Sequence, residues 1–237
     1  MFPRIKVKNK KVSNIKEWES AFNDKIRWKQ GRSAYLLADF VLNRNGLKEI
    51  EKILASCGFR VSKFLSCDVE VSVKFDNNPR CSQRDMVLIG ELENMDKIFI
   101  TIEAKVDEAF GGDTIGNKIS SQKSHRAEEL LNKFIPCYKE QDKKLLYQLF
   151  HATSATIEKG GYGCDFQKSI MLVLVFKAKG FGKDIDYNEK KGQRNYNDFC
   201  NFMQAIGASK REQNAIWNFN FEGQEVFFAY SQIEFVR

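Results

Sequence analysis

Residues 84–111 constrain the fold of this chain more than any other stretch. They contain two apolar-rich runs, Met86–Gly90 and Ile98–Ala104, joined by a polar segment that includes an asparagine. Two short β-type runs joined by a polar turn indicate a β-hairpin. Because side chains alternate along a strand, Glu103 and Lys105 are predicted to project from the same face at the end of the second run.

The register of this hairpin predicts where acidic side chains meet. If Leu92 and Asp96 close the turn, Asp85 lies directly across from Glu103. Opposed Cβ atoms in an antiparallel pair are about 4.5–5.5 Å apart, so the two carboxylates repel unless one is protonated or a cation lies between them. Lys105 supplies one positive charge, and a divalent cation with oxygen ligands would supply the rest. A register slip of one residue would turn Asp85 to the opposite face.

A bare acid-x-Lys pattern is weak evidence for such a site. Two further copies, at Asp142–Lys144 and Glu189–Lys191, lie in charged segments without alternating apolar neighbours. Only the copy at residues 103–105 ends an apolar strand and follows a strand that begins with an aspartate. The alternative interpretation is a solvated strand end with an incidental ion pair, which adds little to stability.

Asp85 followed by Glu103-Ala-Lys105 resembles the motif of the PD-(D/E)XK nuclease superfamily, the restriction-endonuclease-like proteins. Arg84 stands where the proline of that motif would be, and this proline is often absent from members. The resemblance implies a core of a helix, three strands, a helix and a further strand.

A longer string, residues 103–111, is similar to a largely uncharacterised bacterial group of PD-(D/E)XK-like proteins. That group shares a Gly-(Lys/Arg)-Ser-Ala helix start, here Gly31–Ala34, and a Tyr-Gln-Leu-x-His helix, here Tyr147–His151. The resemblance extends over roughly residues 30 to 180, and residues 190–237 add nothing to it.

These resemblances imply a metal-dependent endonuclease, a hydrolase of phosphodiester bonds in nucleic acid, with DNA as the expected substrate. Asp85 and Glu103 would hold Mg²⁺, for which Mn²⁺ can substitute, together with the carbonyl of Ala104. Lys105 lies beside two acids and should stay protonated, so its expected catalytic role is to position water and stabilise charge on the phosphate. Two alternatives stay open: a catalytically silent nucleic-acid-binding or protein-interaction module on the same fold, and an unrelated α/β protein with a surface charge cluster.

Four further residues are candidates for supporting roles. Glu70 can approach the site from a predicted strand over 68–75, although a solvent-facing glutamate is the simpler interpretation. The Tyr-Gln-Leu likeness suggests that Gln148 reaches the site, and a surface amide is the alternative. Lys123 and Arg126, on the polar side of a predicted helix over 119–134, are candidate phosphate contacts, as are cations of residues 177–194; an exposed helix face has the same pattern.

The remaining segments predict an α/β architecture. Apolar residues recur at helical spacing after Asn14, after Ser33, which is a candidate N-cap, and over residues 47–57. Residues 4–11 predict a short edge strand or a basic arm. Helices over 142–158 and 195–206, a strand over 169–177 buried on both faces and a strand over 225–230 complete the pattern. Val69, Val71 and Val73 are predicted to share one face of their strand.

We therefore expect one nuclease-like domain over residues 1–237. It would be a restriction-endonuclease-like α/β sandwich with a mixed central sheet flanked by helices, a mainly helical part over 1–60 and a motif-bearing core over 61–180.

Composition restricts the class of protein further. The chain has 38 Lys and Arg against 31 Asp and Glu, and a net charge of +7 suits a polyanionic partner without proving one. Six cysteines without a Cys-x-x-Cys pair, and only two histidines, argue against a zinc site and for free thiols in the cytoplasm. There is no secretory signal pattern, and the apolar run Ile170–Phe176 is far shorter than the roughly 20 residues that cross a bilayer. We expect a cytoplasmic protein without a membrane partner; whether it forms a homodimer stays open.

Overall fold

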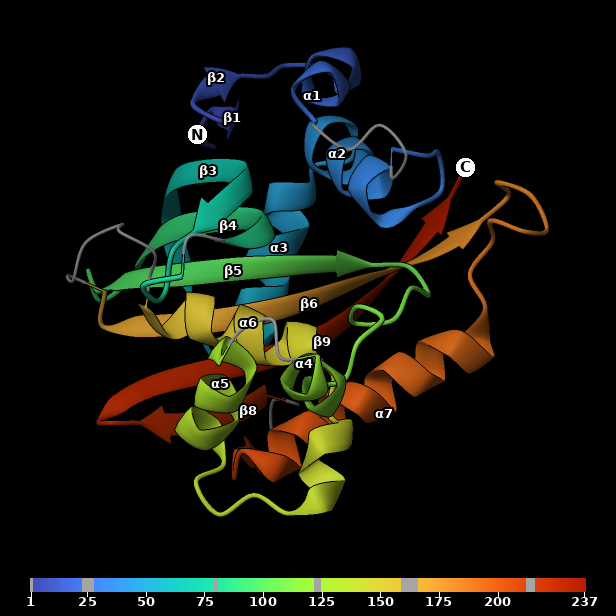
Figure 1. Cartoon of the computed structure of the whole chain (residues 1–237). Coiled ribbons are helices and arrows are strands. Elements are labelled where there is room, and N and C mark those ends of the chain that lie inside the picture. Colours follow the sequence, from blue (N-terminus) through green and yellow to red (C-terminus); the bar gives the residue numbers. More distant parts are fainter. Residues whose placement is uncertain (1, 23–27, 79–80, 122–124, 159–165, 212–215) are drawn as a thin grey trace.

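A mixed β-sheet runs through the computed structural model, which describes residues 2–22, 28–78, 81–121, 125–158, 166–211 and 216–237. In these residues the sheet has nine strands in the order β2-β1-β3-β4-β5-β6-β9-β8-β7 (Figure 1). The strands are β1 (Ile5–Val7), β2 (Lys10–Lys11), β3 (Val61–Val73), β4 (Ser82–Leu92), β5 (Lys97–Lys105), β6 (Lys168–Lys179), β7 (Ser209–Arg211), β8 (Ile216–Phe221) and β9 (Gln224–Val236). The pairs β1–β3, β5–β6 and β6–β9 are parallel, and the other neighbours are antiparallel.

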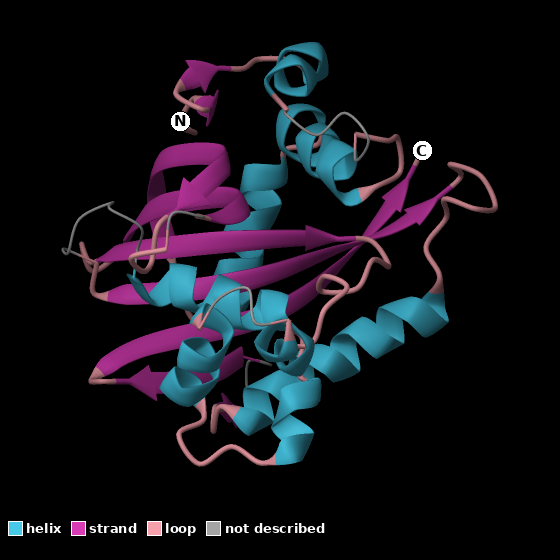
Figure 2. Ribbon diagram, in the orientation of Figure 1, coloured by secondary structure: helices cyan, strands magenta, loops and turns pink. Residues whose placement is uncertain are grey.

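Helices cover both faces of this sheet (Figure 2). They are α1 (Ile15–Ala21), α2 (Ser33–Asn43), α3 (Gly46–Ser56), α4 (Ile115–Ser120), α5 (Arg126–Phe134), the 3₁₀ helix η1 (Glu140–Lys144), α6 (Tyr147–Glu158) and α7 (Glu189–Ala205). Apolar stripes of α2 and α3 bury one face of the sheet, and α5, α6 and α7 bury the other. The strand β6 contributes side chains to both cores, as the prediction of a fully buried strand required.

The predicted hairpin is confirmed as β4 and β5. Met86 pairs with Ile102, and each further pair toward the turn keeps the predicted register. The backbone N–H of Leu92 donates to the carbonyl of Asp96 at 2.8 Å, which closes the turn where the sequence placed it. The core faces of both strands follow from this register, because side-chain direction alternates along each strand.

The alternation predicted for Val69 and Val71 is wrong. Val69 packs in the core beneath α2 and α3, whereas Val71 packs on the opposite face against Val87 and Phe99. The residue between them, Glu70, has φ +55°, a left-handed conformation that β-strand residues rarely adopt. This local irregularity turns the strand over in the middle of the predicted run.

Several helix boundaries also differ from the sequence pattern. Ser33 does not cap α2: the N-cap is Arg32, and the Ser33 N–H donates instead to the carboxylate of Glu108 at 3.3 Å. The predicted helix over 119–134 is two helices, because α4 ends at Ser120 and α5 begins at Arg126. The helix predicted over 142–158 is also two elements, the 3₁₀ helix η1, which ends at Lys144, and α6, which begins at Tyr147.

The last quarter of the chain extends the sheet beyond the predicted core. The predicted strand over 225–230 is longer, spanning β9, and it lies parallel to β6. The sequence pattern did not reveal β8 or β7, which add two antiparallel strands outside β9. The predicted helix over 195–206 begins earlier, at Glu189, and its Asn188 N-cap side chain accepts from the backbone of Lys191.

The five described cysteines are free, at positions 57, 67, 81, 137 and 200. Among the described residues, none of the helices combines the length and apolar character needed to span a bilayer.

Candidate active site at the end of the hairpin

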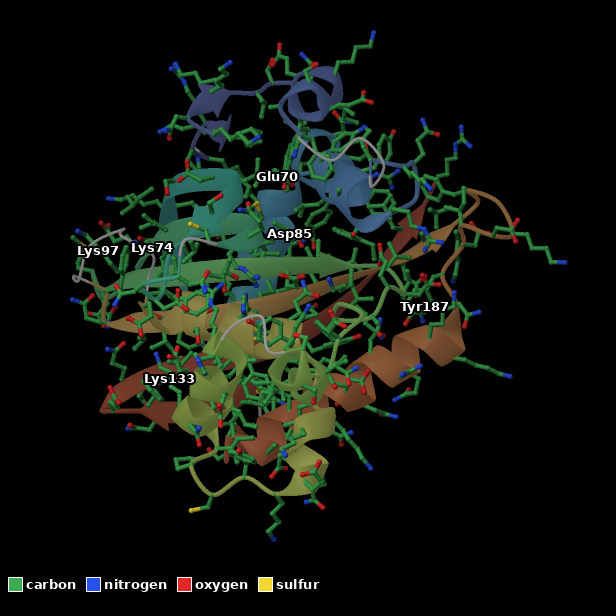
Figure 3. All side chains as sticks on the ribbon, viewed as in Figure 1. Glu70, Lys74, Asp85, Lys97, Lys133 and Tyr187 are labelled. Carbon is green, nitrogen blue, oxygen red and sulfur yellow. The ribbon has the colours of Figure 1, made fainter. Side chains whose placement is uncertain are left out.

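A row of charged residues crosses four neighbouring strands. The adjoining apolar row consists of Val7, Val69, Met86 and Ile102, which are paired across β1, β3, β4 and β5. The next residue of each strand toward the same end of the sheet is charged; these residues are Lys8, Glu70, Asp85 and Glu103. Figure 3 shows Glu70 and Asp85 near one another on the adjacent strands β3 and β4. The hairpin register therefore brings together the predicted acids and adds Glu70 to them.

Glu103 is the most enclosed member of the row, with only 3% of its surface exposed. Arg84 Nη1 donates to Oε2 at 3.0 Å, and Lys105 Nζ donates to Oε1 at 2.8 Å. Gln148 Nε2 also donates to Oε1. Burial alone would raise the pKa of Glu103, but the charges of Lys105 and Arg84 outweigh it and hold the pKa below its ordinary value. Glu103 is thus a buried, fully ionised carboxylate.

Asp85 binds the backbone of the neighbouring strand. The ladder between β4 and β5 ends at Met86 and Ile102, one pair before the predicted Asp85–Glu103 pair. Beyond that point Asp85 Oδ2 accepts a hydrogen bond from the Ala104 N–H at 2.7 Å. The carboxylate therefore lies beside the peptide that links Glu103 to Lys105.

The electrostatics of Asp85 differ sharply from those of Glu103. Burial, reinforced by the negative charge of Glu103, raises the pKa of Asp85 to about 7. The positive charge of Lys105 opposes this rise without cancelling it. Asp85 is therefore poised between its protonated and ionised forms near neutral pH.

Lys105 supplies a buried ammonium group between the two acids. Its exposed fraction is 7%, and its Nζ lies 5.6 Å from the ring centroid of Phe110. Burial lowers the pKa of Lys105, but the charges of Glu103 and Asp85 outweigh burial and raise it above its ordinary value. Lys105 is therefore positively charged at neutral pH, as the sequence predicted, and cannot act as a base there.

Glu70 adds a third acid at the edge of this cluster. Burial, together with the charges of Asp85 and Glu103, raises the pKa of Glu70 to about 8, and Lys8 offsets only part of this. The Glu70 side chain is half-buried. Burial is the largest cause of both raised pKa values, so Asp85 and Glu70 are acids whose ionised forms are poorly solvated at this point of the sheet.

A divalent cation would stabilise the ionised forms of these buried acids, and two carboxylates are a sufficient protein contribution for Mg²⁺. Mg²⁺ keeps several waters and usually takes one or two carboxylates. Within the described part of the chain, Oδ2 of Asp85 accepts a hydrogen bond and Oδ1 accepts none, so Oδ1 is available to a metal ion. Glu103 would have to exchange one of its three donors for the ion. No group of three or more His, Cys, Asp or Glu arranged around a common ion occurs among the described residues.

The second half of the string 103–111 is connected to two helices by hydrogen bonds. Asp107, 6% exposed, accepts from Arg32 Nη1 at 2.7 Å and from the Asn188 N–H at 3.1 Å. Arg32 immediately precedes α2 and Asn188 caps α7, so one carboxylate joins helices that follow different strands.

Glu108 completes this connection. Its carboxylate accepts from the backbone N–H groups of Ser33 and Val106, and its carbonyl accepts from Asn195 Nδ2 at 2.8 Å. The string after Lys105 is thereby tied to the first turn of α2 and to the interior of α7. The Gly-Arg-Ser-Ala sequence is therefore a structural partner of this string.

Gln148 reaches the site, and two neighbours on the same helix form an aromatic contact behind it. The His151 ring lies 4.3 Å from the Tyr147 ring and 5.2 Å from the Phe75 ring, centroid to centroid. Burial, with the positive charges of Arg126 and Arg84, lowers the pKa of His151 to about 3, so this imidazole is neutral.

The two candidate phosphate contacts lie in different situations. Lys123 is outside the described residues. Arg126 is 6% exposed and forms a bidentate ion pair with Asp76, at 2.6 Å and 3.1 Å, while its guanidinium lies 4.3 Å from the centre of the Phe75 ring. A phosphate contact from Arg126 would require this ion pair to break.

The chain belongs to the family described as "Domain of unknown function (DUF6946)", whose profile matches residues 11–235. No curated protein and no solved structure matches the chain.

Sequence reasoning missed the role of Arg84 and of the second acid pair. Arg84 was noticed only because it replaces a proline, yet it is 3% exposed and bonds both Glu103 and Ser82. Its position directly before Asp85 at a strand start was the available signal. For Asp107 and Glu108, no local pattern predicts partners that lie 75 or more residues away.

Proposed function

We propose that this protein is a metal-dependent endonuclease that hydrolyses phosphodiester bonds, with DNA as substrate, on a restriction-endonuclease-like fold. The observation that carries the proposal is the pair of acids, Asp85 and Glu103, which meet with Lys105 where the hairpin ladder ends. One acid is ionised and enclosed, and the other has a pKa raised to about 7. Perturbed titratable groups gathered at one point are typical of functional sites.

The order of elements supports the fold assignment. The helix α3 is followed by the antiparallel strands β3, β4 and β5; then come α4, α5, η1 and α6, and then β6, which lies parallel to β5. With α4, α5 and η1 as an insertion before α6, this order is compatible with the helix, three strands, helix and strand that the superfamily resemblance implies. The chain surrounds this core with the N-terminal helices, α7 and the β8–β9 pair.

Each residue of the site has a defined part in the proposed reaction. Asp85 and Glu103 would hold Mg²⁺ or Mn²⁺, which when bound lowers the pKa of a water and stabilises negative charge on phosphate. Lys105 keeps its proton and places a positive charge beside the phosphate, where charge increases in the transition state. Gln148 and Arg84 fix the orientation of the Glu103 carboxylate.

The decisive experiment compares two lysines of the same strand. Supercoiled plasmid, linear DNA and RNA are incubated with Mg²⁺ or Mn²⁺ and with wild type, Lys105→Ala or Lys97→Ala. Lys97 lies at the other, exposed end of β5, so its variant controls for loss of a strand lysine. We expect Lys105→Ala to reduce cleavage about 10²- to 10³-fold or more, and Lys97→Ala to retain it. Wild-type protein without cleavage of any substrate would contradict the proposal.

One observation favours a second candidate, a nucleic-acid-binding module without turnover. Both oxygens of Glu103 are already occupied by donors from Arg84, Lys105 and Gln148. Calorimetric titration of Mg²⁺ into wild type and into Asp85→Ala/Glu103→Ala separates the two. Mg²⁺ binding by wild type that is lost in the variant supports the enzyme. DNA binding without Mg²⁺ binding by either protein supports the silent module.

A further inference from the structure

We propose that the N-terminal hairpin β1–β2 is a docking surface for the phosphodiester backbone of nucleic acid and leads it to the Asp85–Glu103 site. This inference rests on the proposed function for the identity of the polyanion. It is carried by the distribution of charge along the chain and by the position of the hairpin in the sheet.

The net positive charge of the protein is concentrated in this hairpin and the residues that follow it. Residues 1–16 contain six of the 38 Lys and Arg and none of the 31 Asp and Glu. The remaining 221 residues therefore have 32 cations against 31 acids and are close to neutral. The basic residues of this segment are Arg4, Lys6, Lys8, Lys10, Lys11 and Lys16.

The hairpin is folded onto the sheet as part of the domain. Val7 has no exposed surface and Val12 has 8%, so the apolar side of the hairpin is buried. The Val12 N–H donates to the Ile5 carbonyl at 3.1 Å, and Lys8 Nζ donates to the carbonyl of Ala21 at 3.2 Å. The backbone that carries the hairpin cations is therefore fixed on the domain, which reduces the entropy lost on binding a ligand.

The outward cations are exposed and uncompensated. Arg4, Lys10 and Lys11 are exposed, and within the described part of the chain they form no ion pair. A polyanion can therefore replace water and counterions around these side chains without breaking an internal salt bridge.

The position of the hairpin connects it to the proposed active site. The strand β1 lies parallel to β3, with Val7 beside Val69, so the next residues, Lys8 and Glu70, are neighbours. The charge of Lys8 acts on Glu70, and Glu70 in turn interacts with Asp85. A nucleic-acid backbone that lies along the β1–β2 hairpin toward the hairpin turn is thus directed to the acidic cluster on the adjacent strands. A membrane surface would leave this continuity unexplained.

The test measures binding separately from cleavage. Fluorescence anisotropy of a short labelled DNA duplex, and of the corresponding single strand, is recorded in EDTA over a series of NaCl concentrations. The variant Arg4→Gln/Lys10→Gln/Lys11→Gln is compared with Lys139→Gln/Lys144→Gln/Lys210→Gln. The second variant removes the same charge from exposed sites at η1 and on β7, the strand at the opposite edge of the sheet from β2.

We expect the hairpin variant to bind duplex at least about tenfold more weakly than wild type and to lower the log–log salt slope by about 2 to 3. The control should change either quantity far less. Equal weakening by both variants, or unchanged binding by the hairpin variant, would overturn the proposal. So would a hairpin-dependent interaction seen only with phosphatidylserine-containing vesicles and absent with nucleic acid.

Parallel cleavage assays keep the two proposals distinguishable. Hairpin-dependent DNA binding by a wild type that cleaves nothing would overturn the nuclease and leave the docking surface. Cleavage by wild type, with unchanged binding by the hairpin variant, would overturn the docking surface and leave the nuclease.

Discussion

The six residues Glu103–Glu108 contribute to two acid pairs, Glu103 with Asp85 and Asp107 with Glu108, and the surroundings of the two pairs give them different properties. Glu103 meets Asp85, whose pKa is raised to about 7, so this pair is held under electrostatic repulsion. Asp107 and Glu108 instead accept hydrogen bonds from Arg32, Asn188 and Ser33. Similar side chains in one string thus form a reactive cluster at one end and a structural anchor at the other.

The difference teaches that burial alone does not decide the chemistry of an acid, because the charges and hydrogen-bond donors that packing brings to it also act on its ionisation. Glu103 and Asp107 are almost equally buried, at 3% and 6% exposed. Asp107 faces one cation and a backbone donor, whereas Glu103 shares its cations with Asp85. A divalent cation would stabilise the ionised form of the second acid of that pair.

The largest expected effect is that of Glu103→Gln. Cleavage should fall about 10³-fold, because the variant loses a proposed metal ligand. The free energy of unfolding should also fall by about 3–5 kcal/mol, since Arg84 and Lys105 stay buried without their shared counter-ion. Urea unfolding and plasmid cleavage measure the two effects. Full activity in this variant would remove the distinction between the two acid pairs.

Asp107→Asn is the matched change in the anchoring pair, and its effect should fall on stability alone. The ion pair with Arg32 would be lost, and Arg32 is 27% exposed, so we expect a loss of about 1–3 kcal/mol in the free energy of unfolding. Specific activity per folded molecule should stay within about threefold of wild type. Loss of cleavage with unchanged urea unfolding would show that Asp107 acts in the site itself.

Asp85→Asn should separate stability from activity in the opposite direction. The folded-state pKa of Asp85 is raised to about 7, so wild type loses stability as pH rises from about 4 to 7, when the unfolded chain ionises first. The amide avoids that loss and can still accept from the Ala104 N–H. We expect the variant to be more stable than wild type by roughly 1–2 kcal/mol above pH 7, and inactive. Thermal unfolding with and without Mg²⁺ should show that added metal stabilises only wild type; equal stabilisation would contradict a metal role for Asp85.

The smallest expected change is that of Glu108→Gln. The amide oxygen can still accept from the Ser33 N–H, so the variant loses mainly the favourable interaction of a negative charge with the start of α2. A loss of about 0.3–1 kcal/mol is expected, with no effect on cleavage. Differential scanning calorimetry in low and high salt would measure it, and a loss above about 3 kcal/mol would show that the anchor depends on charge as strongly as the site does.

Local pattern was sufficient for the hairpin and its register. Alternating apolar residues and the turn between Leu92 and Asp96 determine which residues pair, because a slip would expose the whole apolar face. This is why the approach of Asp85 to Glu103 was predictable. Local pattern was insufficient for Glu70, because its left-handed φ of +55° breaks the regular alternation on which the prediction for this strand rested.

The sequence by itself determined the pairing of β4 with β5, the burial of β6 on both faces and the charge of Lys105. The tertiary structure alone decided that Arg84 and Gln148 would enclose Glu103, that Asp107 and Glu108 would anchor α2 and α7, and that the basic N-terminal hairpin would lie beside Glu70. The physical reason is sequence separation. Alternation and turn chemistry act over a few residues, whereas the field at a buried carboxylate is set by every charge that packing brings near it.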